Sequence, residues 1–260
     1  MLQTSHAQSH RGTVRKINED AFLELPHKGV WVVADGMGGH SAGDVASQLI
    51  IDTIQRVVES TELENLSCDM LVNALQTANK ELLQISKNQL EGKLAGSTVV
   101  ILFIHQARCF LLWAGDSRAY LLRDHILSQV TKDHSQVNDM VDEGVLSIEE
   151  AEHHPLANVI TRAVGVDKKL DVEIKEVYLK SNDVFLLCSD GLNKEVSDSE
   201  IQHMLQSGSI IDSGMALLHA CLVRNARDNV TCVLIKNEQE QLLIPELDDD
   251  ITIPFFRTSY

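Results

Sequence analysis

The chain has 260 residues, of which 44% are hydrophobic, and this is enough for one large domain with a sizeable core. Its formal net charge is -16 and it has no run rich in lysine or arginine, so neither nucleic acid nor an anionic membrane is an expected partner. The N-terminal stretch is polar and the apolar run 99–104 is too short to span a bilayer, so we expect neither a signal peptide nor membrane insertion.

The first elements predicted along the chain are a buried strand and two amphipathic helices. The apolar run 30–34 has the length of a strand. Over 43–59 and 69–90, apolar residues recur at helical spacing, which predicts two long helices. The predicted buried face of the first helix consists of Val45, Leu49, Ile50, Ile54 and Val57.

Strands separated by short turns follow. The runs 97–104, 109–115 and 119–123 are apolar and are bounded by Gly, Asp or short polar turns. This close succession predicts an antiparallel meander from about 97 to 130 and argues against a doubly wound parallel sheet.

The remaining elements are a polar flap, two more helices and two more strands. Residues 131–165 are polar and weakly periodic, which predicts short helices in an exposed flap. Strands are predicted at 184–189 and 230–235, with helices at 197–206 and 213–226 between them. Hairpin-paired strands with helices in two groups predict an α+β fold in which helices cover a β-sandwich.

Composition also sets the domain limits and the expected compartment. We expect one domain over 1–236, followed by an acidic, extended C-terminal tail over 237–260. The five cysteines form no C-x-x-C pair and several lie inside apolar runs, as is typical of reduced, buried thiols. The sequence therefore predicts a cytoplasmic protein.

Carboxylates recur at the ends of the predicted strands. Asp35, Asp116 and Asp190 each follow an apolar run, and Asp228 precedes one. A single Asp-Gly after a strand is usually a turn. Several acids at sheet edges, however, repel one another unless they are neutralised, and Mg²⁺ or Mn²⁺ is the usual neutraliser because these ions prefer oxygen ligands. The pattern therefore indicates a metal site.

Four further residues extend this candidate site. Glu19 and Asp20 form an acidic cluster just before another apolar run. Gly36 lets the backbone approach a ligand closely, and a carbonyl at this point is a candidate metal ligand. Arg15 carries a guanidinium group, which is suited to a bidentate grip on phosphate.

Seven motifs occur along the chain in this order: R-x-x-N-E-D, DGMGGHSAG, AGSTVV, GDSRAY, ITRAVG, DVFLLCSDGL and ARDNVTCVLI. Their order resembles that of the metal-dependent protein serine/threonine phosphatases, the type 2C or PPM family, in its bacterial branch. The resemblance covers roughly residues 5–236. It implies an α-β-β-α sandwich, with two antiparallel sheets flanked by helix pairs, a flap subdomain, and metals at one edge.

The resemblance also implies which residues hold the metals. Asp35 would bridge two Mn²⁺ or Mg²⁺ ions, with the Gly36 carbonyl on one of them. Asp190 and Asp228 would hold the other ion. Asp116, together with Asp190, would help to hold a possible third, weaker ion.

Other roles are implied for the residues around these ligands. Glu19 and Asp20 would bind directly or through metal-bound waters, Arg15 would bind the substrate phosphate, and Asn229 would order the metal shell.

The proton donor stays open. Eukaryotic members place a histidine, a proposed general acid, right after the Asp-Gly pair, whereas this chain has Met37, as bacterial members commonly do. The nearby His40 and a metal-bound water are the two candidates.

The resemblance implies a hydrolase that removes phosphate from phosphoserine and phosphothreonine by a metal-activated water, without a covalent intermediate. Its expected partners are phosphorylated proteins, namely a serine/threonine kinase of the same cell and the substrates of that kinase, in a signalling role. We expect a monomer. The alternative is a catalytically inactive, phosphatase-like binding module, which the intact Asp and Arg positions disfavour.

Overall fold

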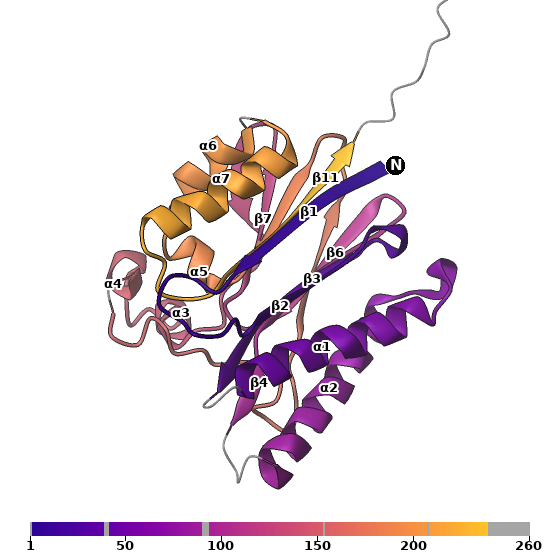
Figure 1. Cartoon of the computed structure of the whole chain (residues 1–260), viewed down its shortest axis with the longest axis vertical. Helices are drawn as coiled ribbons and strands as arrows, with labels where there is room; N and C mark the ends of the chain where they lie inside the picture. Colours follow the sequence, from indigo (N-terminus) through magenta and orange to yellow (C-terminus); the bar gives the residue numbers. More distant parts are fainter. Residues whose placement is uncertain (1, 39–41, 90–93, 153, 207, 239–260) are drawn as a thin grey trace, which may run out of the picture.

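Two antiparallel β-sheets lie face to face between two layers of helices in the computed structural model (Figure 1). The structure describes residues 2–38, 42–89, 94–152, 154–206 and 208–238. His40 and nearly all of the predicted tail lie outside these ranges. The arrangement confirms the predicted α+β sandwich of two antiparallel sheets.

The first sheet has the strand order β1-β11-β10-β7-β8. Its strands are β1 (Leu2–His10), β7 (Arg118–Arg123), β8 (Ile126–Gln129), β10 (Val184–Cys188) and β11 (Val230–Glu238). Strand β1 was not predicted, because it is a polar edge strand without an apolar run. It is held by antiparallel pairing with β11, from Leu2 opposite Glu238 to His10 opposite Val230.

The second sheet has the order β2-β3-β5-β6-β9, and β4 pairs with the end of β3. Its strands are β2 (Asp20–Leu25), β3 (Val30–Gly38), β4 (Ala95–Ser97), β5 (Val99–His105), β6 (Arg108–Ala114) and β9 (Glu173–Tyr178). Apolar side chains of both sheets, among them Trp31, Trp113 and Phe185, fill the space between them. This central core fixes the strand ends at which the predicted acids lie.

The predicted meander over 97–130 is wrong at its middle. The hairpins β5-β6 and β7-β8 both form, but β6 and β7 belong to different sheets. Gly115, with a φ of 118°, begins the turn in which the chain crosses from one sheet to the other. Apolar runs do not reveal which sheet a strand joins, and this crossing places Asp116 between the two sheets.

Helices cover the outer face of each sheet (Figure 1). Helices α1 (Ala42–Glu59) and α2 (Cys68–Asn88) cover the β2-β3-β5 side, and α6 (Asp198–Gln206) and α7 (Ile210–Val223) cover the other sheet. The prediction that Val45 faces the core is wrong, because its side chain is exposed. The buried stripe of α1 instead includes Ala42, Ala46, Ile50, Ile54 and Val58.

Three short helices lie near one end of the sandwich. Within the predicted flap over 131–165 are α3 (Gln136–Asp142) and α4 (Ile148–Glu152), and α5 (Asp190–Asn193) follows β10. Figure 1 shows α3 and α4 on the same side of the molecule as α5. None of the described helices is long and apolar enough to cross a membrane.

Candidate active site

Asp20 and Asp35 face each other across the antiparallel pair of β2 and β3. Residues 30–34 of β3 are buried, and Asp35 is the first residue of the strand that reaches a cavity. Its backbone is fixed by Thr98, whose N–H donates to the Asp35 carbonyl at 2.9 Å and whose hydroxyl accepts from the Asp35 N–H at 3.3 Å. The sheet therefore holds two carboxylates at one end of the sandwich.

Hydroxyl groups from the other sheet anchor Asp20. Ser189 Oγ and Thr231 Oγ1 donate to Asp20 Oδ2 at 2.8 and 2.7 Å. In the described part of the chain, the buried Asp20 Oδ1 has no hydrogen-bond partner. Burial, together with the charges of Asp190 and Asp228, raises the pKa of Asp20 to about 7, although the two hydroxyl groups lower it. An unpaired buried oxygen among like charges is suited to a cation or its bound water.

The neighbouring acids repel one another as well. Burial and the charge of Asp20 hold the pKa of Asp35 well above its ordinary value. Burial and the charge of Asp190 raise the pKa of Asp116 to about 7, and Lys194 opposes this rise. Because all these donors are oxygen atoms, the site matches hard divalent cations such as Mg²⁺ and Mn²⁺.

Two basic side chains hold two of the acids in ion pairs. Asp190 begins α5, and Lys194, one helical turn later, forms an ion pair with it. Arg15 Nη2 donates to Oδ2 of Asp228 at 2.9 Å, and Asp228 stands just before β11. Burial lowers the pKa of Lys194, but the charge and hydrogen bond of Asp190, with the charges of Asp116 and Asp228, together raise the pKa above its ordinary value.

Asn229 braces the loop that carries Arg15 and Glu19. Its Oδ1 accepts from the Glu19 N–H at 2.8 Å, and its Nδ2 donates to the carbonyls of Arg11 and Ile17, both at 3.0 Å. The N–H of Gly36 in turn donates to the Glu19 carbonyl at 3.0 Å. One side chain beside Asp228 thus ties the N-terminal loop to β11 and, through Glu19, to β3.

Gly36 lies where three backbone segments meet. A Cβ added there would lie 2.0 Å from the carbonyl oxygen of Gly43 in α1 and 2.5 Å from that of Glu19. We therefore expect Gly36→Ala to lower the free energy of unfolding by roughly 2–4 kcal/mol and to reduce metal-dependent turnover, because α1 or β3 must shift. Urea unfolding and turnover assays measure both effects.

Gly208→Ala is the matched control, because the nearest atom to its added Cβ is 3.4 Å away. We expect it to change stability by less than about 0.5 kcal/mol. A Gly36→Ala protein with unchanged stability and turnover would show that the close approach has no role.

Most of the predicted site residues line one cavity of about 300 Å³. They are Arg15, Glu19, Asp35, Gly36, Asp116, Asp190, Asp228 and Asn229. Asp20 is not among the lining residues but lies opposite Asp35 in the sheet. Acids that are far apart in the sequence therefore meet at one edge of the sandwich, as their positions at strand ends predicted.

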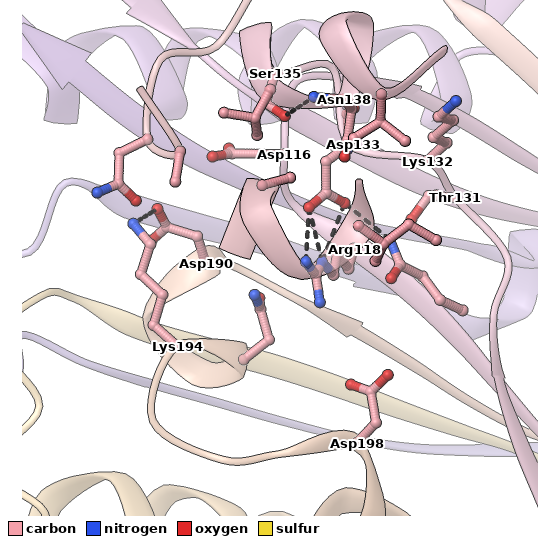
Figure 2. Close-up of a pocket in the computed structure, with 18 of the residues that line it drawn as sticks. Asp116, Arg118, Thr131, Lys132, Asp133, Ser135, Asn138, Asp190, Lys194 and Asp198 are labelled. Atoms are coloured by element: carbon pink, nitrogen blue, oxygen red, sulfur yellow. Dashed lines mark hydrogen bonds and ion pairs between the residues drawn. The ribbon is translucent and has the colours of Figure 1, made fainter. Parts of the chain in front are cut away.

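A second, larger cavity of about 1160 Å³ adjoins the first and shares Asp116, Asn158, Asp190 and Lys194 with it. It lies between the flap helices and the segment from α5 to the start of α6 (Figure 2). The small cavity has room for ions and a small ligand group, and the larger cavity leaves room beside it for the rest of such a ligand.

No three described His, Cys, Asp or Glu side chains are already arranged to hold an ion. Arg15 and Lys194 each engage the Oδ2 atom of one acid, Asp228 and Asp190 respectively, so an ion can reach the Oδ1 atoms without displacing either base. The oxygen donors, the unpartnered Asp20 Oδ1 and the closely packed backbone at Gly36 nevertheless fit a hard cation.

Sequence reasoning missed Ser189, Thr231 and Lys194. The two hydroxyl residues stand beside the acidic motifs, with Ser189 just before Asp190, and this adjacency was the readable signal. The only sequence signal for Lys194 was its position four residues after Asp190, the spacing at which a lysine can pair with an acid on a helix.

Comparisons with known proteins place the chain among phosphatases. The family described as Protein phosphatase 2C matches residues 4–225. The serine/threonine phosphatase stp of Listeria monocytogenes serotype 4b (strain F2365) is 33% identical over 249 residues, which cover 91% of this chain and 97% of that protein.

Solved structures agree with this. The structure of PppA, a key regulatory component of T6SS in Pseudomonas aeruginosa, has a TM-score of 0.81 and 41% identity, and the match covers 90% of this chain and 97% of that one. The catalytic domain of the serine threonine protein phosphatase PstP, solved with two manganese ions, has a TM-score of 0.82 and 33% identity. The match covers 91% of this chain and 99% of that one.

Proposed function

The chain belongs to the protein phosphatase 2C family and is a metal-dependent serine/threonine phosphatase, and we propose that it hydrolyses phosphate esters in the cavity around Asp35. The observation that carries this assignment is the pair Asp20 and Asp35, opposed in the sheet beside Asp190 and Asp228. The alternative of an inactive binding module is not supported, because the named relatives are phosphatases and one was solved with two manganese ions.

We infer the following ligand set for the cations. Asp35 would contact both ions and the Gly36 carbonyl one of them, while Asp190 and Asp228 would hold the other. Two divalent cations in such a site supply catalysis by lowering the pKa of bound water to near neutrality. The manganese in the PstP structure supports Mn²⁺, and Mg²⁺ has the same preference for oxygen. Asp116 and Asp190 are the acids that a possible third, weaker ion would use.

Glu19 and Asp20 would contact the ions either directly or through waters bound to the ions. Asp20 suits this role because one of its oxygens is held by two hydroxyl groups and the other is free of protein partners in the described chain. The free Oδ1 atom of Asp20 would then accept a hydrogen bond from a water on one of the ions, while Oδ2 stays bound to the two hydroxyl groups.

Arg15 is the proposed phosphate-binding residue. Its side chain is 48% exposed at the rim of the small cavity, and its guanidinium group is bound on one side by Asp228. The remaining N–H groups can donate to phosphate oxygens, which is the bidentate mode that arginine favours.

We expect Arg15→Ala to raise KM for a phosphopeptide about 10- to 100-fold and to leave the affinity for Mn²⁺ nearly unchanged. The reason is that a lost charge-assisted hydrogen bond costs about 1.5–3 kcal/mol. Steady-state kinetics and calorimetry measure the two quantities. Arg56→Ala, on the exposed side of α1, should change neither. Loss of Mn²⁺ binding in Arg15→Ala would instead assign Arg15 to the metal shell.

The substrates are phosphoproteins, and we propose that a serine/threonine kinase of the same cell and its substrates are the partners. We propose a monomer, since the ligand set inferred above and Arg15 need no residue from a second copy of the chain. A cytoplasmic location is supported by five unpaired cysteines. We propose one phosphatase domain over roughly 1–236 with a flap over 131–165, since β1 and β11, at its two ends, pair with each other.

The direct test is phosphate release from phosphoserine and phosphothreonine peptides with Mn²⁺, with Mg²⁺, and with EDTA. We expect release with either metal and none with EDTA. Absence of release at every metal concentration, from protein that is folded by circular dichroism, would contradict the proposed function.

A further inference from the structure

Lys194 lies where the small cavity and the larger cavity meet. It is placed there by α5, which begins at Asp190 directly after β10, so that the lysine follows one turn later on the same face. Figure 2 shows its side chain directed toward the Asp190 carboxylate, with which it forms an ion pair.

The ammonium group of Lys194 interacts with more than one acid. Besides the direct pair with Asp190, its charge acts on Asp116 and Asp228, which line the same small cavity. Only 39% of its side chain is exposed, although lysines usually extend their charge into water. The residue is therefore held against the carboxylates by its position in the fold.

The acids that Lys194 engages are those offered to the weaker third ion. Asp190 and Asp116 repel each other, and the charge of Lys194 is attractive to both. A divalent cation between Asp190 and Asp116 would lie beside the ammonium group of Lys194, which already engages Asp190 Oδ2, and would be repelled by it. The two cations therefore compete for this position.

We propose that the ammonium group of Lys194 takes the place of the third cation between Asp190 and Asp116, so that the protein works with two divalent ions and binds a third only when Lys194 is displaced. The inference rests on the proposed dinuclear site. It assigns Lys194 a positioning role: it neutralises Asp190 and orients this carboxylate without consuming a metal ion. It also implies that activity saturates at the metal concentration that fills the first two sites.

The chain offers a matched control in the same larger cavity. Lys132 also lines this cavity and also pairs with an acid, Asp142, but it lies outside the small cavity. Lys132→Gln removes the same charge from another wall of the same cavity, while Lys194→Arg keeps the charge at the proposed position.

The test is to count bound Mn²⁺ in the full chain after removal of metal by EDTA, using calorimetry and electron paramagnetic resonance of free Mn²⁺. We expect two ions in wild type, Lys132→Gln and Lys194→Arg. We expect three ions in Lys194→Gln. The Kd of the third ion in this variant should be at least tenfold lower than the Kd of any third ion in wild type. Adding Asp116→Asn to Lys194→Gln should return the count to two.

Two results would overturn the inference: a count of two in Lys194→Gln, or a third ion in wild type that binds as tightly as in Lys194→Gln. Phosphopeptide hydrolysis on the same samples separates the two levels of the account. If wild type is active with two ions and Lys194→Gln also binds two, only the proposed role of Lys194 is contradicted. If wild type binds no Mn²⁺ and is inactive, both the proposed function and this inference are contradicted.

Discussion

Replacing Asp35 by asparagine is expected to lower kcat by at least about 10³-fold while leaving the fold intact. Asparagine keeps the shape and the backbone hydrogen bonds to Thr98 but removes the negative charge that the proposed bridging role needs. In the metal-free protein it also removes repulsion with Asp20, so stability should not fall. Turnover of phosphopeptide at saturating Mn²⁺, with circular dichroism and thermal unfolding, measures both parts.

Asp124→Asn is the matched control for this change. Asp124 lies in the exposed turn between β7 and β8 with a φ of 50°, a conformation that asparagine adopts readily. We expect its kcat to equal that of wild type. A variant with asparagine at position 35 that retained more than a tenth of wild-type turnover would remove Asp35 from the catalytic centre.

The second large effect concerns stability in the absence of metal. The pKa of Asp20 is raised to about 7 in the folded protein, so between about pH 4 and pH 7 the folded state binds more protons than the unfolded state. Stability from this group therefore falls as pH rises through that window. Asp20→Asn removes the penalty, and above pH 7 the metal-free variant should be more stable than metal-free wild type, by at most about 4 kcal/mol.

Urea unfolding in EDTA at pH 5 and pH 8 tests this sign. The advantage of Asp20→Asn should grow with pH, whereas Asp124→Asn should show no pH-dependent difference from wild type. An advantage that shrank with rising pH would mean that the Asp20 carboxylate is stabilised, not strained, in the metal-free fold. Adding Mn²⁺ should favour wild type over Asp20→Asn, because the carboxylate then has a cation nearby.

The sequence showed that the acids stand beside strands, and this favoured a shared cation site. Asp35 and Asp190 follow apolar runs and Asp228 precedes one, so all three stand near the ends of predicted strands. The layered α+β architecture followed from the same runs together with helical spacing over α1 and α2. These features are local, so a single chain shows them directly.

The features that sequence reasoning missed depend on contacts between distant segments. The hydroxyl groups that hold Asp20 come from residues 169 and 211 positions away in the chain. Strand β1 has no apolar run and is defined by its partner β11. The crossing at Gly115 depends on how two hairpins share one core, and no local pattern encodes that choice.

The central claim is that the carboxylates around Asp35 hold two divalent ions, and anomalous scattering from manganese-soaked crystals tests it most directly. Two peaks are expected roughly 3.5–4 Å apart, both in contact with Asp35. Crystals at saturating manganese that show no peak in this cavity, or a single peak away from Asp35, would contradict it.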